Sequence, residues 1–69
     1  MRLILHTKQR DKIIDEVTKL CTPELIQTLP PHPHCRSLPA IHDLDVHHSI
    51  GVIEGRENII AYIRGKVQP

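Results

Sequence analysis

The sequence has almost no aromatic side chains: Tyr62 is its one tyrosine, and it has no phenylalanine or tryptophan. Its 69 residues carry 9 Lys and Arg against 8 Asp and Glu, so the formal net charge is only +1. Proteins bind phosphate backbones and single strands with basic surfaces and aromatic stacking platforms. The composition therefore argues against a nucleic-acid partner and predicts a core of Ile, Leu and Val.

Long hydrophobic runs are also missing. The apolar run near the start, Leu3–Leu5, is short beside the roughly 7–15 residues of a signal peptide. No stretch approaches the roughly 18 apolar residues of a membrane span. We therefore expect no membrane partner and a cytoplasmic location, where Cys21 and Cys35 stay as free thiols by default.

A chain of 69 residues forms one domain, 1–69. A domain this small buries only about 60% of the surface that its unfolded chain exposes. Contacts with a protein partner, or with a second copy of the chain in a homodimer, could therefore contribute to its stability.

Helical periodicity occurs in two segments. The first has these apolar residues on one face: Ile13, Ile14, Val17, Leu20 and Cys21. The second has these: Ile59, Ile60, Ile63 and Val67. We expect Thr7 to cap the first helix, and we expect the second helix to span Arg56–Gly65 after a break at Gly55.

Short apolar segments predict strands at Leu3–Leu5, buried on both faces, at Ala40–His42 and at Ile50–Ile53. Residues 23–29 leave two alternatives. Thr-Pro-Glu is a good helix start, but a strand over Glu24–Leu29 would give the first strand a parallel partner. We favour the strand.

Proline and histidine dominate residues 30–37, which predicts a loop because proline lacks an N–H and restricts the residue before it. Potential zinc ligands lie in or beside this loop: His32, His34, Cys35 and His42. Nitrogen and sulfur donors suit zinc, and a metal would help a small domain. The spacing matches no established zinc motif, so we favour solvated histidines and no cofactor, with zinc as the alternative.

Cys21 and Cys35 could form a disulfide that ties the first helix to the loop as a redox switch. We favour the simpler interpretation, in which Cys21 completes the apolar helix face and Cys35 is a loop thiol. Four acidic residues are expected in exposed turns and at a helix start, as caps rather than catalysts: Asp43, Asp45, Glu54 and Glu57. We therefore expect no enzyme.

The predicted series, β-α-β, loop, proline-led β, β, Gly, α, resembles a trimmed thioredoxin or glutaredoxin fold. The resemblance rests on residues 37–41, Ser-Leu-Pro-Ala-Ile, which look like the strand entry that holds the family's cis-proline, and on Gly55 ahead of the last helix. It implies an α/β fold in the order β-α-β-β-β-α, with helices packed on a small mixed sheet. For the bond before Pro39 we favour trans, because only about 5–6% of X–Pro bonds are cis.

The family's chemistry uses a Cys-x-x-Cys pair after the first strand, where the helix dipole lowers the thiol pKa. The corresponding residues 6–10 read His-Thr-Lys-Gln-Arg and contain no cysteine, so dithiol chemistry is not carried over.

We therefore expect a non-enzymatic thioredoxin-like binding or regulatory module that acts through a sheet edge, the proline loop or a helix face. Small accessory proteins of viruses and plasmids often fit this description. The alternatives are a thiol-redox protein that uses Cys21 and Cys35, and a small zinc-binding protein.

Overall fold

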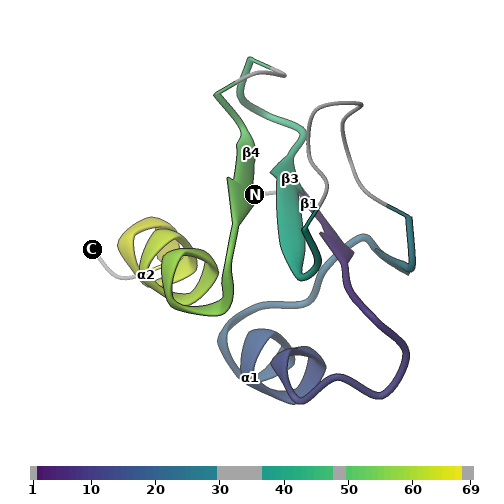
Figure 1. Ribbon diagram of the computed structural model, residues 1–69. Helices are drawn as coiled ribbons and strands as arrows, with labels where there is room; N and C mark the ends of the chain where they lie inside the picture. Colours follow the sequence, from purple (N-terminus) through teal and green to yellow (C-terminus); the bar gives the residue numbers. More distant parts are fainter. Residues whose placement is uncertain (1, 30–36, 48–49, 68–69) are drawn as a thin grey trace.

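The computed structural model of the chain describes residues 2–29, 37–47 and 50–67. In chain order the elements are β1 (Leu3–His6), α1 (Ile13–Leu20), β2 (Leu25–Gln27), β3 (Ala40–Asp43), β4 (Val52–Glu54) and α2 (Arg56–Val67) (Figure 1). The predicted α/β order is confirmed, and the alternative of a helix over 23–29 is wrong. The predicted loop 30–37 lies outside the described residues except for Ser37.

The strands form one mixed sheet in the order β2-β1-β3-β4. β1 pairs with β2 in parallel, because α1 carries the chain back to the same end of the sheet. β3 runs antiparallel to both β1 and β4. The predicted small mixed sheet is confirmed, with β2 and β4 as its two edges.

Both helices lie side by side on one face of this sheet (Figure 1). Side chains alternate along a strand, so Leu3 and Leu5 of β1 point to the helices, and Ile4 points away. The buried cluster beneath the helices is aliphatic, as predicted: Leu3, Leu5, Ile13, Val17, Ile41, Ile59 and Ile63. Ile4 is only half-buried, so the expectation that this strand is buried on both faces is wrong for its outer side.

The start of α1 and the end of α2 differ from what the sequence suggested, whereas α2 starts at Arg56 as predicted. α1 begins at Ile13, whose N–H donates to the side chain of Asp11 at 2.9 Å, and Thr7 lies buried in the preceding turn. Thr7 is therefore not the cap. α2 follows Gly55, whose φ of 89° lies in the left-handed region that favours glycine, and it extends to Val67 rather than Gly65.

The hairpin of β3 and β4 is also shifted from its prediction. The Leu38–Pro39 peptide is cis, so the expected trans bond is wrong. β4 starts at Val52 instead of Ile50, because the N–H groups of Ile50 and Gly51 donate to His47 O in a turn, at 2.9 and 2.7 Å. β3 extends one residue further than expected, to Asp43.

Candidate functional site

The turn between β1 and α1 occupies the position where the resemblance would place a dithiol. Thr7 anchors it, since its N–H donates to Gln27 O at 2.8 Å. The carboxylate of Asp11 accepts a hydrogen bond from the first N–H of α1, so a negatively charged group already lies at the positive, N-terminal end of the helix dipole. Residues 6–10 contain no cysteine, so the turn lacks the dithiol that the resemblance would place there.

His6, at the end of β1, is a functional candidate that the sequence reasoning missed. It is only 4% exposed, and its Nδ1–H donates to Leu29 O, since a carbonyl can only accept. That contact leaves Nε2 as the acceptor of the neutral ring, and Nε2 is buried with no partner among the described residues. Burial lowers the pKa of His6, against an increase from the Leu29 hydrogen bond.

His42 lies on the same outer face of the sheet as His6. The register pairs His6 with Ala40 and Ile4 with His42, so the two histidines are diagonal neighbours across β1 and β3. Charge on His42 is a further cause that lowers the pKa of His6. This juxtaposition could not be predicted without the register of the strands.

The zinc hypothesis remains a prediction. Of its candidate ligands the structure describes His42, and three lie outside the described residues: His32, His34 and Cys35. Within the part of the chain that the structure describes, no group of three or more His, Cys, Asp or Glu residues could hold a metal ion.

The redox hypothesis also remains a prediction, because Cys35 lies outside the described residues. Cys21 directly follows α1, is half-buried and packs against the core cluster. Burial raises the pKa of its thiol, which lowers the thiolate population that attack on a disulfide requires. This environment suits a small apolar side chain better than a reactive one.

The acidic residues fall into two classes. Asp45, Glu54 and Glu57 are exposed, as expected. Asp43 is 1% exposed, which corrects the expectation of an exposed turn. It lies at the end of β3, where its carboxylate accepts from the Tyr62 hydroxyl of α2 at 2.6 Å, so it anchors the helix to the sheet.

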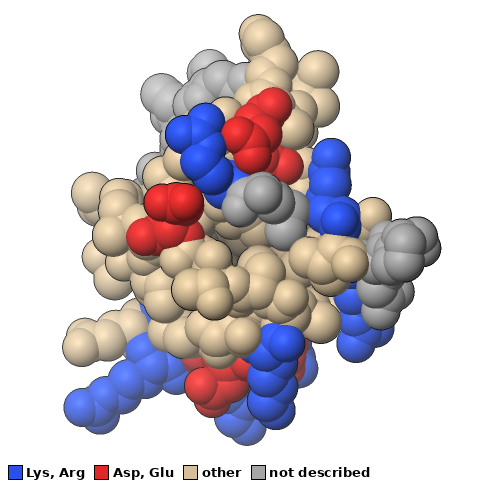
Figure 2. All heavy atoms as spheres, turned by 180° about the vertical axis from the view of Figure 1, so that it is seen from behind, with Lys and Arg blue, Asp and Glu red and all other residues tan. Residues whose placement is uncertain are grey.

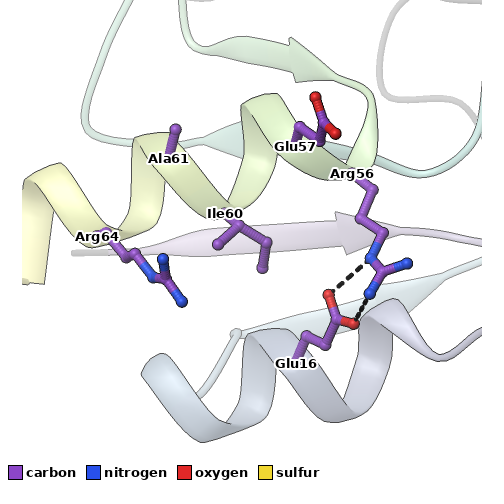
Figure 3. Close-up of a pocket in the computed structure, with 6 residues that line it drawn as sticks. All are labelled: Glu16, Arg56, Glu57, Ile60, Ala61 and Arg64. Carbon is purple, nitrogen blue, oxygen red and sulfur yellow. Dashed lines mark hydrogen bonds and ion pairs between the residues drawn. The ribbon is translucent and has the colours of Figure 1, made fainter.

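A hollow of about 520 Å³ runs along α2 beside α1, and Figure 3 shows its lining. Arg56 crosses it with a two-pronged hydrogen bond to Glu16, one prong being Nε to Oε2 at 2.8 Å. This ion pair raises the pKa of Arg56. Since the guanidinium is already neutralised and the Arg56 side chain is 62% exposed, we interpret the hollow as a surface seam between the helices.

Three of the large apolar side chains that are exposed in the described residues lie in or just after the edge strand β2. Leu25 is 47% exposed and Ile26 is 43% exposed, and Leu29 just beyond the strand is 67% exposed. Leu25–Leu29 contains no charged residue and no proline. These are the residues that usually prevent an edge strand from pairing with another chain. We call Leu25, Ile26 and Leu29 the β2 edge patch, and it is the candidate site.

Charge does not mark a binding surface on the face of the molecule that Figure 2 shows. Acidic and basic side chains occur together there, around a broad uncharged area. The pair formed by Arg2 and Asp45, joined at 3.0 Å, illustrates this local compensation, and it lowers the pKa of Asp45.

Comparison of the chain with protein-family models, curated proteins and solved structures gives no match. In the described parts of the chain, neither helix has the length and hydrophobicity needed to cross a membrane.

Proposed function

We propose that this chain is a small protein-binding module of thioredoxin-like architecture, without dithiol chemistry, that recognises an extended segment of a partner through the β2 edge patch. The observation that carries the proposal is the exposure of Leu25, Ile26 and Leu29 on an uncharged edge strand. Monomeric proteins seldom expose an apolar edge strand without charged residues or proline unless a partner covers it.

The thioredoxin-like part of the proposal is supported by the order and placement of the elements. The order β-α-β-β-β-α agrees with the resemblance, Pro39 directly precedes β3, and Gly55 directly precedes α2. The segment that would hold the family's cysteines lies in the turn between β1 and α1 and has none. The architecture supports binding, and the missing residues remove the chemistry that such a fold would otherwise suggest.

The geometry of β2 favours an extended partner. Ile26 shares a register position with Leu5, which is fully buried because a strand lies on each side of it. Ile26 has a strand on one side only. A partner strand would add main-chain hydrogen bonds and cover Ile26 on one face and Leu25 on the other, which is the mode of β-strand addition.

The proposal includes a cytoplasmic, non-enzymatic role. The described cysteine, Cys21, packs against the core with a raised thiol pKa, and this supports a chain that keeps its thiol reduced and does not use it for exchange. Intact mass of the native protein, with and without reductant and chelator, tests this. A mass gain on reduction or a loss of one metal ion on chelation would support the redox or zinc alternative instead.

The central experiment is selection of peptides that bind the immobilised chain, with each selected peptide then tested on two variants. Ile26→Lys places a charge on the edge strand, which opposes pairing with another strand. We therefore expect it to weaken peptide binding by at least about tenfold. Ile50→Lys is the matched control, since Ile50 is equally apolar and 68% exposed but lies in the turn before β4. Peptides that bind Ile26→Lys as tightly as the wild type would contradict the proposal.

A further inference from the structure

β2 and β4 are both edges of the sheet, but only β4 has a charged residue within the strand. β4 ends in the exposed Glu54, and α2 packs against this strand. β2 consists of three uncharged residues, and the exposed Glu24 directly precedes it. An edge strand without charged residues is a template for strand pairing. At high protein concentration, the strand that most often meets this edge belongs to another copy of the same chain.

We propose that the β2 edge patch pairs with the β2 edge patch of a second copy of this chain, in an antiparallel arrangement whose two-fold axis passes through Ile26. The inference rests on the proposed function, since it names one partner for the same surface. A two-fold axis makes the contact close on itself, so that the two four-stranded sheets join and neither copy offers the edge again.

The sequence of β2 is compatible with itself in this register. Ile26 of one copy lies beside Ile26 of the other, and Leu25 lies opposite Gln27. The one charged residue at this edge, Glu24, lies opposite the neutral Thr28. No like charges meet, and the half-exposed isoleucines cover each other.

The strength of this contact is limited by its length. β2 has only three residues, so the pairing falls below the roughly 1,200 Å² of a standard interface. We therefore expect a reversible monomer–dimer equilibrium that depends on concentration, rather than an obligate dimer. Such a dimer would compete with an extended partner for the same edge.

Thr28 provides a test of the register. In Thr28→Glu, an acid faces Glu24 of the other copy, and the two-fold axis repeats this repulsion, so the dimer Kd should rise by about tenfold. In Thr28→Lys, a base faces Glu24, so the dimer should be at least as tight as in the wild type. Thr28 is exposed, and neither change alters the core.

Sedimentation equilibrium of the full chain over a range of concentrations measures the dimer for the wild type, Thr28→Glu, Thr28→Lys and the control Ile50→Lys. Circular dichroism checks that each variant is folded. We expect the wild type, Thr28→Lys and Ile50→Lys to dimerise, and Thr28→Glu to be weakened. A wild type that stays monomeric, or a dimer that responds equally to both Thr28 variants, overturns the inference. If the wild type stays monomeric but still binds peptides, and Ile26→Lys abolishes that binding, only the inference of a dimer is wrong and the proposed function stands.

Discussion

The hydroxyl of Tyr62 joins α2 to the sheet by donating to the buried carboxylate of Asp43 at 2.6 Å. Burial, followed by this hydrogen bond and the charge of Asp43, raises the pKa of Tyr62 to about 12. The backbone N–H of Asp45 donates to the other carboxylate oxygen at 3.0 Å. Tyr62 therefore supplies a hydrogen bond that the buried carboxylate would otherwise lack.

Tyr62→Phe should lower the free energy of unfolding by about 1.5–3 kcal/mol near neutral pH, because it removes a hydrogen bond to a charged, buried acceptor. The raised pKa means that this contribution is complete below the pKa of an unfolded tyrosine, 10.0, and is lost as the pH rises towards about 12. Urea unfolding measures both effects. Equal stability of the two proteins near neutral pH would contradict the role given to Tyr62.

His6 should make the protein less stable in acid. Its pKa is lowered below 6.5 by burial, so the unfolded state binds the proton more readily, and stability is lost as the pH falls from about 6.5 through the lower pKa of the folded state. His6→Asn keeps an N–H near the position of Nδ1 and does not titrate. We expect this variant to lose less stability than the wild type between about pH 7 and pH 5.

Urea unfolding at the two pH values tests this expectation. Gln9→Asn, at an exposed residue that does not titrate, is the control for the change of side chain and should keep the acid sensitivity of the wild type. The same pH dependence in the wild type and His6→Asn would contradict the prediction.

At the scale of elements, two glycines at either end of α2 should respond to alanine in opposite directions. Gly55 has a φ of 89° and donates its N–H to Pro39 O at 3.1 Å, so it holds the turn from β4 into α2. A Cβ there meets only Asn58 Nδ2 at 3.5 Å, an ordinary contact, so the cost is one of backbone conformation. Gly65 lies within α2, and a Cβ there has nothing within 4 Å.

Gly55→Ala should therefore destabilise the protein by about 1–2 kcal/mol. Gly65→Ala should stabilise it by about 0.5–1 kcal/mol, because alanine restricts the unfolded chain and favours the helix. Thermal unfolding of both variants provides the comparison. A Gly55→Ala variant as stable as the wild type would show that the conformation at Gly55 does not control the turn.

At the scale of the whole molecule, the protein depends on one aliphatic cluster shared by both helices and the sheet. Ile63 of α2 is fully buried in it. Ile63→Ala leaves a cavity, and such changes cost about 2–5 kcal/mol. Since the stability of small domains lies near the lower end of about 5–15 kcal/mol, we expect this variant to keep at most about 3 kcal/mol of this stability and to lose its helices at a much lower temperature than the wild type.

Circular dichroism of Ile63→Ala measures the loss of helix directly. Ile50→Ala, at a residue that is 68% exposed, should leave the spectrum unchanged. Cooperative, wild-type-like unfolding of Ile63→Ala would show that the molecule does not rely on this shared core.

The sequence predicted the kind of surface that forms the candidate site, but not which residues form it. A sheet edge was among the surfaces expected to bind a partner, but Leu25 and Ile26 fitted an apolar helix face as well as a strand, and nothing in their spacing showed that they lie on an edge. That depends on the strand order, because β2 pairs on one side only. His6 was missed for the same reason: its hydrogen-bond partner, Leu29, is distant in the sequence.

The sequence by itself determined the α/β class, the order of the elements other than β2, and the aliphatic core, because these follow from local periodicity, turn residues and the near absence of aromatics. Only the tertiary structure decided the strand register, the burial of Asp43 and His6, and the exposure of the β2 edge patch. Each of these depends on which distant segments of the chain meet. Hydrogen bonds and burial between two such segments leave no pattern in the sequence of either segment taken alone.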